Sequence, residues 1–140
     1  MAFNTYMNYA IEEAKRAFGR GEVPIGAVII DQYGTILSKE GNRTIELNDP
    51  TAHAEILAIR KACDELKNQR LTNCSMYVTL EPCPMCAAAI SNARISKLFF
   101  GVEDYKSGGV YNGPKFTLIN NVTIYQKFLT ELGKPKGNIS

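Results

Sequence analysis

The chain has 140 residues, the size of one domain, and a chain of this length buries roughly two thirds of its unfolded surface without needing cross-links. It has 16 Lys and Arg against 14 Asp and Glu, so its net charge of +2 excludes a general nucleic-acid binder that depends on a strongly basic surface. No apolar run is long enough to span a bilayer and no secretory signal is recognisable, so we expect a cytoplasmic protein whose four cysteines stay reduced.

The first predicted elements are a helix and a hairpin. Residues 6–18 carry apolar side chains at spacings of three and four, which predicts an amphipathic helix. Residues 25–31 form a short apolar run rich in β-branched side chains, residues 32–34 are typical of a turn, and residues 35–39 form a second short run. Two such runs around a turn predict an antiparallel hairpin.

The rest of the chain alternates helices with strands. Apolar spacing predicts helices over residues 52–66 and 84–94 and strands over residues 75–80, 97–102 and 122–125. This alternation predicts a layered α/β domain that opens with an antiparallel hairpin and continues through crossovers. Because the sequence has no internal repeat and no linker, we expect one domain over residues 1–140.

Two cysteines lie three residues apart in the segment EPCPMC, residues 81–86. Pro84 suits the first position of a helix, which places Cys83 at the cap and Cys86 one turn later on the same face. The positive end of the helix favours the thiolate form that binds metal. A redox dithiol has the same geometry, so the spacing alone leaves both alternatives open.

The chain's single histidine, His53, lies in the segment TAHAE at the start of the second predicted helix. A single histidine is by itself more often a surface residue than a ligand. Together with Cys83 and Cys86, however, it completes a set of one imidazole and two thiolates that suits zinc and leaves a fourth position for water. The sequence therefore predicts a catalytic zinc site with three protein ligands.

Glu55 follows His53 by two residues, and residues at that spacing on a helix do not face the same way. A glutamate in a first helical turn can still lean toward the ligand's water, so we interpret Glu55 as a proton carrier and not as a fourth ligand. The other cysteines, Cys63 and Cys74, lie on an apolar helix stripe and just before a buried strand. We expect both to be small core side chains.

The pattern H-x-E followed by P-C-x-x-C is that of the zinc nucleobase deaminases, and the chain resembles this family. Within the family it is similar to the bacterial tRNA adenosine deaminases, which convert the wobble adenosine to inosine. The segments that carry this resemblance are NDPTAHAE, VTLEPCPMC, GEVPIGAV, the GN pair at residues 41–42, RLTNC and FFGVEDYKSGG.

The resemblance implies a three-layer α/β/α fold of the cytidine-deaminase type, with a central mixed sheet of about five strands. It also implies a homodimer that acts on a tRNA anticodon stem-loop as a zinc-dependent hydrolase, with one zinc ion per subunit held by His53, Cys83 and Cys86. In this mechanism Glu55 takes a proton from water, protonates the ring nitrogen N1 and finally delivers a proton to the departing ammonia.

The same resemblance implies a set of substrate contacts. The Asn42 amide would bond the base edge and the Ala54 N–H would face the reacting edge, whereas an asparagine after glycine is otherwise an ordinary turn residue. Asp104 and Lys106 would lie near the ribose and backbone, in what otherwise reads as a charged loop. The expected apolar walls, each of which could equally be simple core packing, are Val23, Ile25 and Leu80.

Two other functions compete with this interpretation. A free-base deaminase, of guanine above all, shares NDPTAHAE and EPCPMC, but EVPIGAV, YVTLEPC and the loop over residues 104–109 favour the tRNA enzymes. A noncatalytic zinc-stabilised RNA-binding module would need a fourth protein ligand such as Cys74. The chain departs from the tRNA enzymes after this loop, and there we expect the lysines to act as phosphate contacts: Lys127, Lys134 and Lys136.

Overall fold

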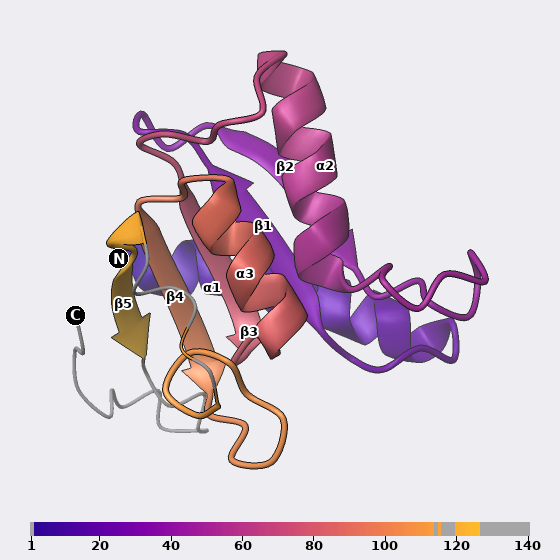
Figure 1. Ribbon diagram of the computed structural model, residues 1–140. Coiled ribbons are helices and arrows are strands. Elements are labelled where there is room, and N and C mark those ends of the chain that lie inside the picture. Colours follow the sequence, from indigo (N-terminus) through magenta and orange to yellow (C-terminus); the bar gives the residue numbers. More distant parts are fainter. Residues whose placement is uncertain (1, 114, 116–119, 127–140) are drawn as a thin grey trace.

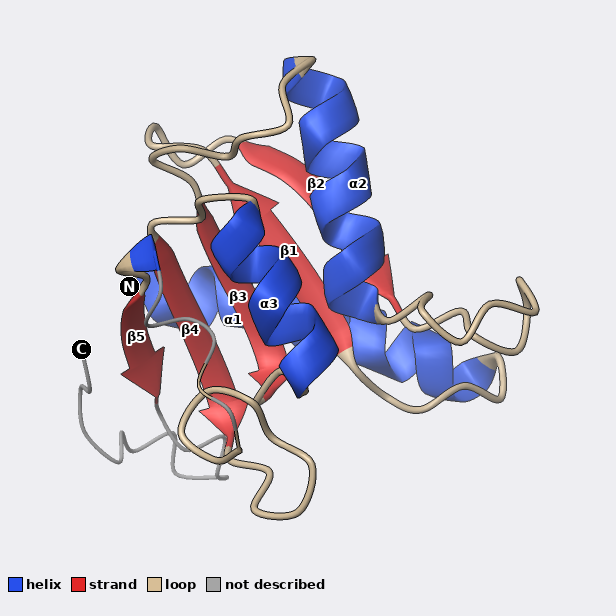
Figure 2. Ribbon diagram, viewed as in Figure 1, coloured by secondary structure: helices blue, strands red, loops and turns tan. Residues whose placement is uncertain are grey.

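One mixed sheet with helices on both faces makes up the domain (Figures 1 and 2). The computed structural model describes residues 2–113, 115 and 120–126. The elements in chain order are α1 (Ala2–Gly19), β1 (Gly26–Ile30), β2 (Ile36–Gly41), α2 (Ala54–Leu66), β3 (Ser75–Leu80), α3 (Pro84–Asn92), β4 (Lys97–Val102) and β5 (Thr123–Gln126).

The strand order is β2-β1-β3-β4-β5. β1 pairs antiparallel with both β2 and β3, whereas β3, β4 and β5 run parallel to one another. The parallel pair β3–β4 requires a crossover, and α3 provides it. α1 lies on one face of the sheet, and α2 and α3 lie on the other (Figure 1). The three-layer α/β/α fold with a five-stranded mixed sheet is therefore confirmed.

Alternate residues of the central strands fill two separate cores. In β1, Ala27 and Ile29 face the larger core together with α2 and α3, and Val28 and Ile30 face the core beneath α1. β3 and β4 alternate in the same way, and this period of two gives each face of the sheet its own apolar surface. The larger core lies directly beneath the helices whose N-termini carry His53 and Cys83.

The predicted elements all exist, and several of them have ends that differ from the prediction. The first helix begins at Ala2 and not at residue 6, because Asn4 and Thr5, residue types that favour a helix cap, lie inside the helix here. The second helix begins at Ala54, since His53 takes the extended cap position. The predicted phosphate contacts Lys127, Lys134 and Lys136 lie outside the described residues. Within the described part of the chain, no helix is both long and apolar enough to cross a membrane.

α1 packs closely on the sheet at Gly26, where β1 begins. A Cβ atom at this position would lie 2.7 Å from the backbone nitrogen of Ala14 and closer still to the carbonyl oxygen of Ala10. Both of these residues are buried on the sheet side of α1. The absence of a side chain at Gly26 therefore lets the backbone of the helix approach the strand.

Candidate metal centre and active site

The structure brings His53, Cys83 and Cys86 together. His53 Nδ1 lies 3.7 Å from Cys83 Sγ and 3.5 Å from Cys86 Sγ, and the ligand atoms of all three residues lie within 4.8 Å of one another. A zinc ion with bonds of about 2.3 Å to sulfur and about 2.1 Å to nitrogen separates two tetrahedral ligands by about 3.6 Å. The three side chains therefore fit a zinc ion.

Two helix N-termini place these ligands. His53 is the N-cap of α2 with φ −73° and ψ 154°, and Cys83 is the N-cap of α3 with φ −70° and ψ 170°. Pro84 occupies the start of α3, and Cys86 follows in its first turn, as the sequence predicts. The His53 side chain makes no capping hydrogen bond to α2, whereas the Cys83 thiol interacts with Cys86 in the first turn of α3.

The two thiols share a proton. A hydrogen bond with Cys86 lowers the pKa of Cys83 to about 5, against the opposing effect of burial. The same hydrogen bond, together with burial, raises the pKa of Cys86, whose thiol donates to the Cys83 thiolate. One thiolate is thus already formed at neutral pH, and a cation that binds to the pair displaces the remaining proton.

Glu55 lies in the first turn of α2, beside the ligand cluster. Its side chain is only 3% exposed, and burial raises the pKa of its carboxyl to about 7. The carboxyl group interacts with the Cys86 thiol, yet its Oε1 atom has no hydrogen-bond partner. A buried carboxylate oxygen without a partner is costly, and such an atom beside a metal cluster indicates that a ligand or water belongs there.

Among the described residues, no further ligand joins the cluster. All four cysteines are free, and Cys63 and Cys74 belong to the larger apolar core or pack against it, as expected. Burial raises the pKa of both of these thiols, which disfavours metal binding. Among the described residues, the site therefore lacks the fourth protein ligand that a purely structural zinc requires.

Asn42 and Ala54, both expected to contact the substrate, form a hydrogen bond with each other. The Ala54 N–H donates to Asn42 Oδ1 over 2.8 Å. The Asn42 backbone N–H donates to the Ile25 carbonyl over 3.2 Å, and its own carbonyl accepts from Arg20 over 3.0 Å. Asn42 is 4% exposed, so these bonds hold a buried side chain in one orientation.

The remaining predicted site residues differ in exposure. Val23 is 58% exposed, whereas Ile25 and Leu80 are half-buried, and Ile25 also packs against the larger core. Asp104 is half-buried and Lys106 is exposed on the loop after β4. Sequence reasoning overlooked Glu81, a buried carboxylate at the end of β3 that binds this same loop.

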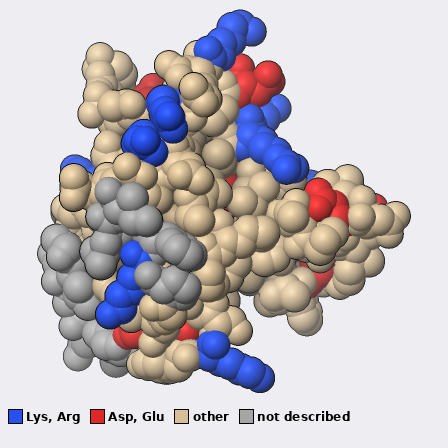
Figure 3. All heavy atoms as spheres, viewed as in Figure 1, with Lys and Arg blue, Asp and Glu red and all other residues tan. Residues whose placement is uncertain are grey.

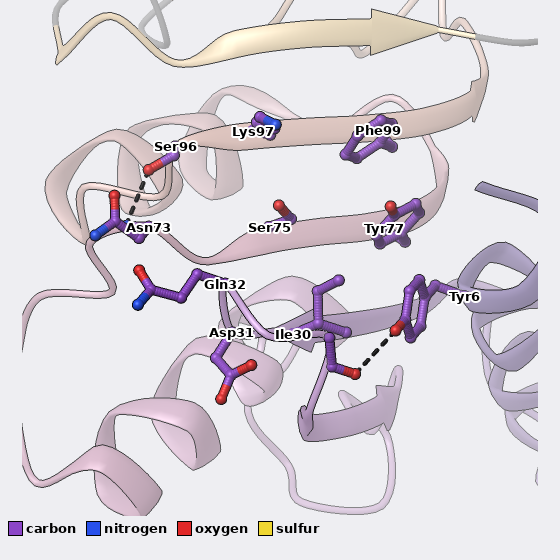
Figure 4. Close-up of a pocket in the computed structure, with 11 residues that line it drawn as sticks. Tyr6, Ile30, Asp31, Gln32, Asn73, Ser75, Tyr77, Ser96, Lys97 and Phe99 are labelled. Atoms are coloured by element: carbon purple, nitrogen blue, oxygen red, sulfur yellow. Dashed lines mark hydrogen bonds between the residues drawn. The ribbon is translucent and has the colours of Figure 1, made fainter. Parts of the chain in front are cut away.

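A separate cavity of about 510 Å³ lies apart from the group of His53, Cys83 and Cys86 (Figure 4). Figure 4 shows aromatic side chains at one end, including Tyr77 and Phe99, and polar side chains such as Gln32 and Asn73 at the other. The Tyr77 and Phe99 rings stack at 4.3 Å between centroids and belong to the core beneath α1. The cavity is therefore on the face of the sheet opposite α2 and α3, and it is not part of the metal centre.

Basic side chains on the face in Figure 3 lie in several separate groups and do not form one continuous patch. This distribution agrees with the net charge of +2. Contacts to a polyanion on this face would therefore be local.

Comparison with known proteins places the chain among deaminases. The family model for the cytidine and deoxycytidylate deaminase zinc-binding region matches residues 2–102. The tRNA-specific adenosine deaminase of Agrobacterium fabrum is 54% identical over 111 residues, which cover 79% of this chain and 72% of that protein. The enzyme of the same name from Aquifex aeolicus is 48% identical over 119 residues, which cover 85% and 77%.

Two solved structures are similar to the chain in both sequence and fold. A structure from a study of A-to-I editing by tRNA:A34 deaminases at the wobble position superimposes with a TM-score of 0.82 at 48% identity, covering 88% of this chain and 91% of that one. Guanine deaminase from Bacillus subtilis superimposes with a TM-score of 0.69 at 42% identity, covering 71% and 64%. The ligand residues His53, Cys83 and Cys86 all lie inside the segment that the family model matches.

Proposed function

The chain belongs to the cytidine and deoxycytidylate deaminase zinc-binding family, and we propose that it hydrolyses the wobble adenosine of a tRNA anticodon loop to inosine. The observation that carries the chemistry is the buried, partly unsatisfied Glu55 carboxylate beside three side chains that fit a zinc ion. The choice of substrate is supported by relatives of that name at 54% and 48% identity.

His53, Cys83 and Cys86 would hold one zinc ion per chain, and such an ion supplies hydroxide near neutral pH by lowering the pKa of water. The protein contributes two helix N-termini, whose positive ends favour thiolate ligands. The reaction consumes one water molecule and one adenosine, breaks the C6–N6 bond and releases ammonia.

Glu55 carries the protons. With a pKa of about 7, its carboxyl can both accept and release a proton at neutral pH. It accepts a proton from water and passes it to ring nitrogen N1 while the C6–O bond forms, and it then delivers a proton to the departing ammonia. Its orphan Oε1 atom is available for this exchange.

Asn42 orients the base. Its backbone groups and Oδ1 are already engaged, so Nδ2 is the group left to donate to the base edge. The Ala54 N–H lies beside it, between His53 and Glu55, near the reacting edge. Val23, Ile25 and Leu80 form the apolar walls for the base in this proposal. Asp104 and Lys106 contact the ribose and backbone from the loop after β4.

The substrate enters as a single unstacked base. Sequence-specific RNA recognition targets loop bases that can be splayed out and read on their edges, which needs only a small basic contact area. The modest net charge is compatible with such a substrate. We further propose that the protein is a cytoplasmic homodimer, like the family members that it resembles, with each site near the interface.

A second candidate is a free-base deaminase, because guanine deaminase from Bacillus subtilis is 42% identical with a TM-score of 0.69. One assay separates the two. The zinc-loaded protein is incubated with an unmodified anticodon stem-loop that has adenosine at the wobble position, and in parallel with guanine, cytosine and free adenosine. Inosine in the RNA alone supports the tRNA activity, whereas xanthine from guanine supports the second candidate. A stem-loop with guanosine at the wobble position is the control.

A further inference from the structure

Glu81 is a buried carboxylate that the chemistry described above does not use. It lies at the end of β3, two residues before Cys83, and its side chain is only 2% exposed. Among the described residues no Lys or Arg forms an ion pair with it. Its carboxylate instead accepts hydrogen bonds from N–H groups of one loop.

That loop follows β4 and spans residues 103–112, and Glu81 binds both of its ends. Oε1 accepts from the Asp104 backbone N–H at 3.0 Å and from Asn112 Nδ2 at 2.7 Å. Oε2 accepts from the backbone N–H groups of Val110, Tyr111 and Asn112 at 3.0, 2.9 and 3.0 Å. Successive N–H groups that converge on one anion form a backbone nest, and here the anion is a side chain of the protein itself.

The middle of the same loop packs on the segment that carries the metal ligands. The Gly109 N–H donates to the Pro82 carbonyl over 2.7 Å. A Cβ atom at Gly109 would lie 2.6 Å from the Cα and nitrogen atoms of Pro84, and one at Gly108 would overlap the Glu81 carboxylate. The loop is therefore held directly against residues 81–84 and cannot shift without breaking these contacts.

Residues 105–107 of the loop are exposed to solvent. Asp104 Oδ1 accepts from the backbone N–H groups of Lys106 and Ser107 at 3.1 and 2.9 Å, and the Asp104 carbonyl accepts from Gly108 at 2.9 Å. Tyr105, at the tip of this turn, is 75% exposed. The loop thus presents a formed turn on the surface, while the two ends of the loop are bound by Glu81.

We propose that Glu81 is a positioning residue for RNA, which acts through this loop and not on the reacting base. Its carboxylate fixes the turn at Asp104–Ser107 relative to the metal-ligand segment, so that the loop meets the RNA backbone while the target base lies in the site. This inference rests on the proposed function. It assigns to Glu81 a share of RNA affinity that is separate from the chemical step.

The variant Glu81→Gln tests the proposal because it keeps the size of the side chain and replaces one acceptor oxygen by an NH2 group. Whichever way the amide turns, at least two of the loop's donors lose their acceptor. We expect KM for the anticodon stem-loop to rise about tenfold, with kcat changed less than about threefold. The zinc content should stay at one ion per chain.

A second readout follows the loop itself. Amide hydrogen exchange in peptides covering residues 104–112 should become faster in Glu81→Gln, because the N–H groups of the nest lose protection. The matched control is Glu65→Gln, which makes the same change of charge at an exposed position of α2 and should change neither readout. Asn112→Ala removes a single bond to Glu81, and it provides the same comparison if Glu81→Gln does not fold.

A higher KM together with faster loop exchange, at retained zinc content and kcat, supports the proposal. Values equal to those of Glu65→Gln would overturn it, and so would a lower kcat or lost zinc with KM unchanged, since Glu81 would then act on the metal site. If the unmutated protein makes no inosine in the stem-loop, the proposed function fails. The exchange comparison still decides whether Glu81 holds the loop.

Discussion

The Ala54 N–H donates to Asn42 Oδ1 over 2.8 Å and thereby joins the first residue of α2 to the residue that follows β2. Ala54 lies between His53 and Glu55, so this bond fixes the short stretch of chain that carries a metal ligand and the buried carboxylate. It also turns the amide of Asn42 so that Nδ2 points away from Ala54. One side chain thus has the structural role that this bond shows, beside the contact with the base that we propose for it.

The variants Asn42→Asp and Asn42→Ala should separate these roles. Aspartate keeps an acceptor for the Ala54 N–H at the positive end of α2 but has no donor for the base, so we expect kcat/KM to fall about tenfold or more with zinc retained. Alanine also leaves a buried N–H unsatisfied, which should lower the free energy of unfolding by about 1–3 kcal/mol. Urea unfolding and steady-state kinetics measure the two effects. Full activity of Asn42→Asp would show that Nδ2 does not contact the base.

Replacement of Glu55 by Gln should slow turnover strongly and leave the metal in place. The carboxylate carries protons in the proposed mechanism, whereas the ligand atoms belong to His53, Cys83 and Cys86. We expect kcat to fall by about 10²–10⁴-fold, the usual contribution of a general acid–base group. Metal analysis of the purified variant provides the control, and loss of zinc together with activity would contradict the assigned role.

The same variant should be more stable than the unmutated protein when both are metal-free at alkaline pH. Burial raises the pKa of Glu55 from 4.5 to about 7, so the folded state favours the protonated form. Its contribution to stability is then fully present below pH 4.5 and is lost as the pH rises through about 7. Glutamine stays neutral, and at about 1.4 kcal/mol per pH unit its advantage should reach about 3 kcal/mol at pH 8.

Chemical denaturation of both metal-free proteins between pH 4 and pH 8 measures this difference. The gap between the two free energies of unfolding should be small at the acid end and should widen through the neutral range. A gap that is independent of pH would mean that Glu55 ionises in the folded protein as it does in the unfolded chain.

Cys83 should be the first cysteine to react with an alkylating reagent in the metal-free protein. Its pKa of about 5 makes it a thiolate at pH 6, whereas burial raises the pKa of Cys63 and Cys74. We therefore expect iodoacetamide at pH 6 to label Cys83 ahead of the other cysteines. Peptide mass spectrometry locates the label, and added zinc should block it. Equal labelling of all four cysteines would contradict the shared proton between Cys83 and Cys86.

The sequence predicts the central sheet well because the evidence for it is local. The bounds predicted for residues 75–80 and 97–102 are those of β3 and β4, since the middle of each strand is a short apolar run that is largely buried. The start of α3 is predictable as well, because Pro84 is compatible with the first turn of a helix and with little beyond it. The metal ligands stand out for the same reason, as rare residue types at a recognisable spacing.

Glu81 and Glu22 were not predictable because their partners are distant in sequence. The sequence predicts that an acidic residue beside a proline is exposed. Glu81 is buried instead, because its carboxylate accepts hydrogen bonds from donors 23 to 31 residues further along the chain. Glu22 likewise accepts from Thr44, Ile45 and Glu46; burial raises its pKa, but these bonds lower it to a net value below the ordinary range. Neither set of hydrogen bonds leaves a periodic pattern or a motif in the sequence, so these bonds are visible only in the folded structure.

Gly26 gives a test of the fold that is independent of the site. Alanine at this position would place a Cβ atom against the backbone of α1 at Ala10 and Ala14, where no flexible side chain can move aside. We expect Gly26→Ala to lower the free energy of unfolding by about 3 kcal/mol, the upper range for overpacking a core. Gly19→Ala is the matched control, because a Cβ atom there meets nothing within 4 Å at the end of a helix. It should be neutral or stabilising by up to about 1 kcal/mol. Urea unfolding of both variants decides the point: a small effect at Gly26 would mean that α1 can withdraw from the sheet without loss of stability, and that its contact with β1 is not tight.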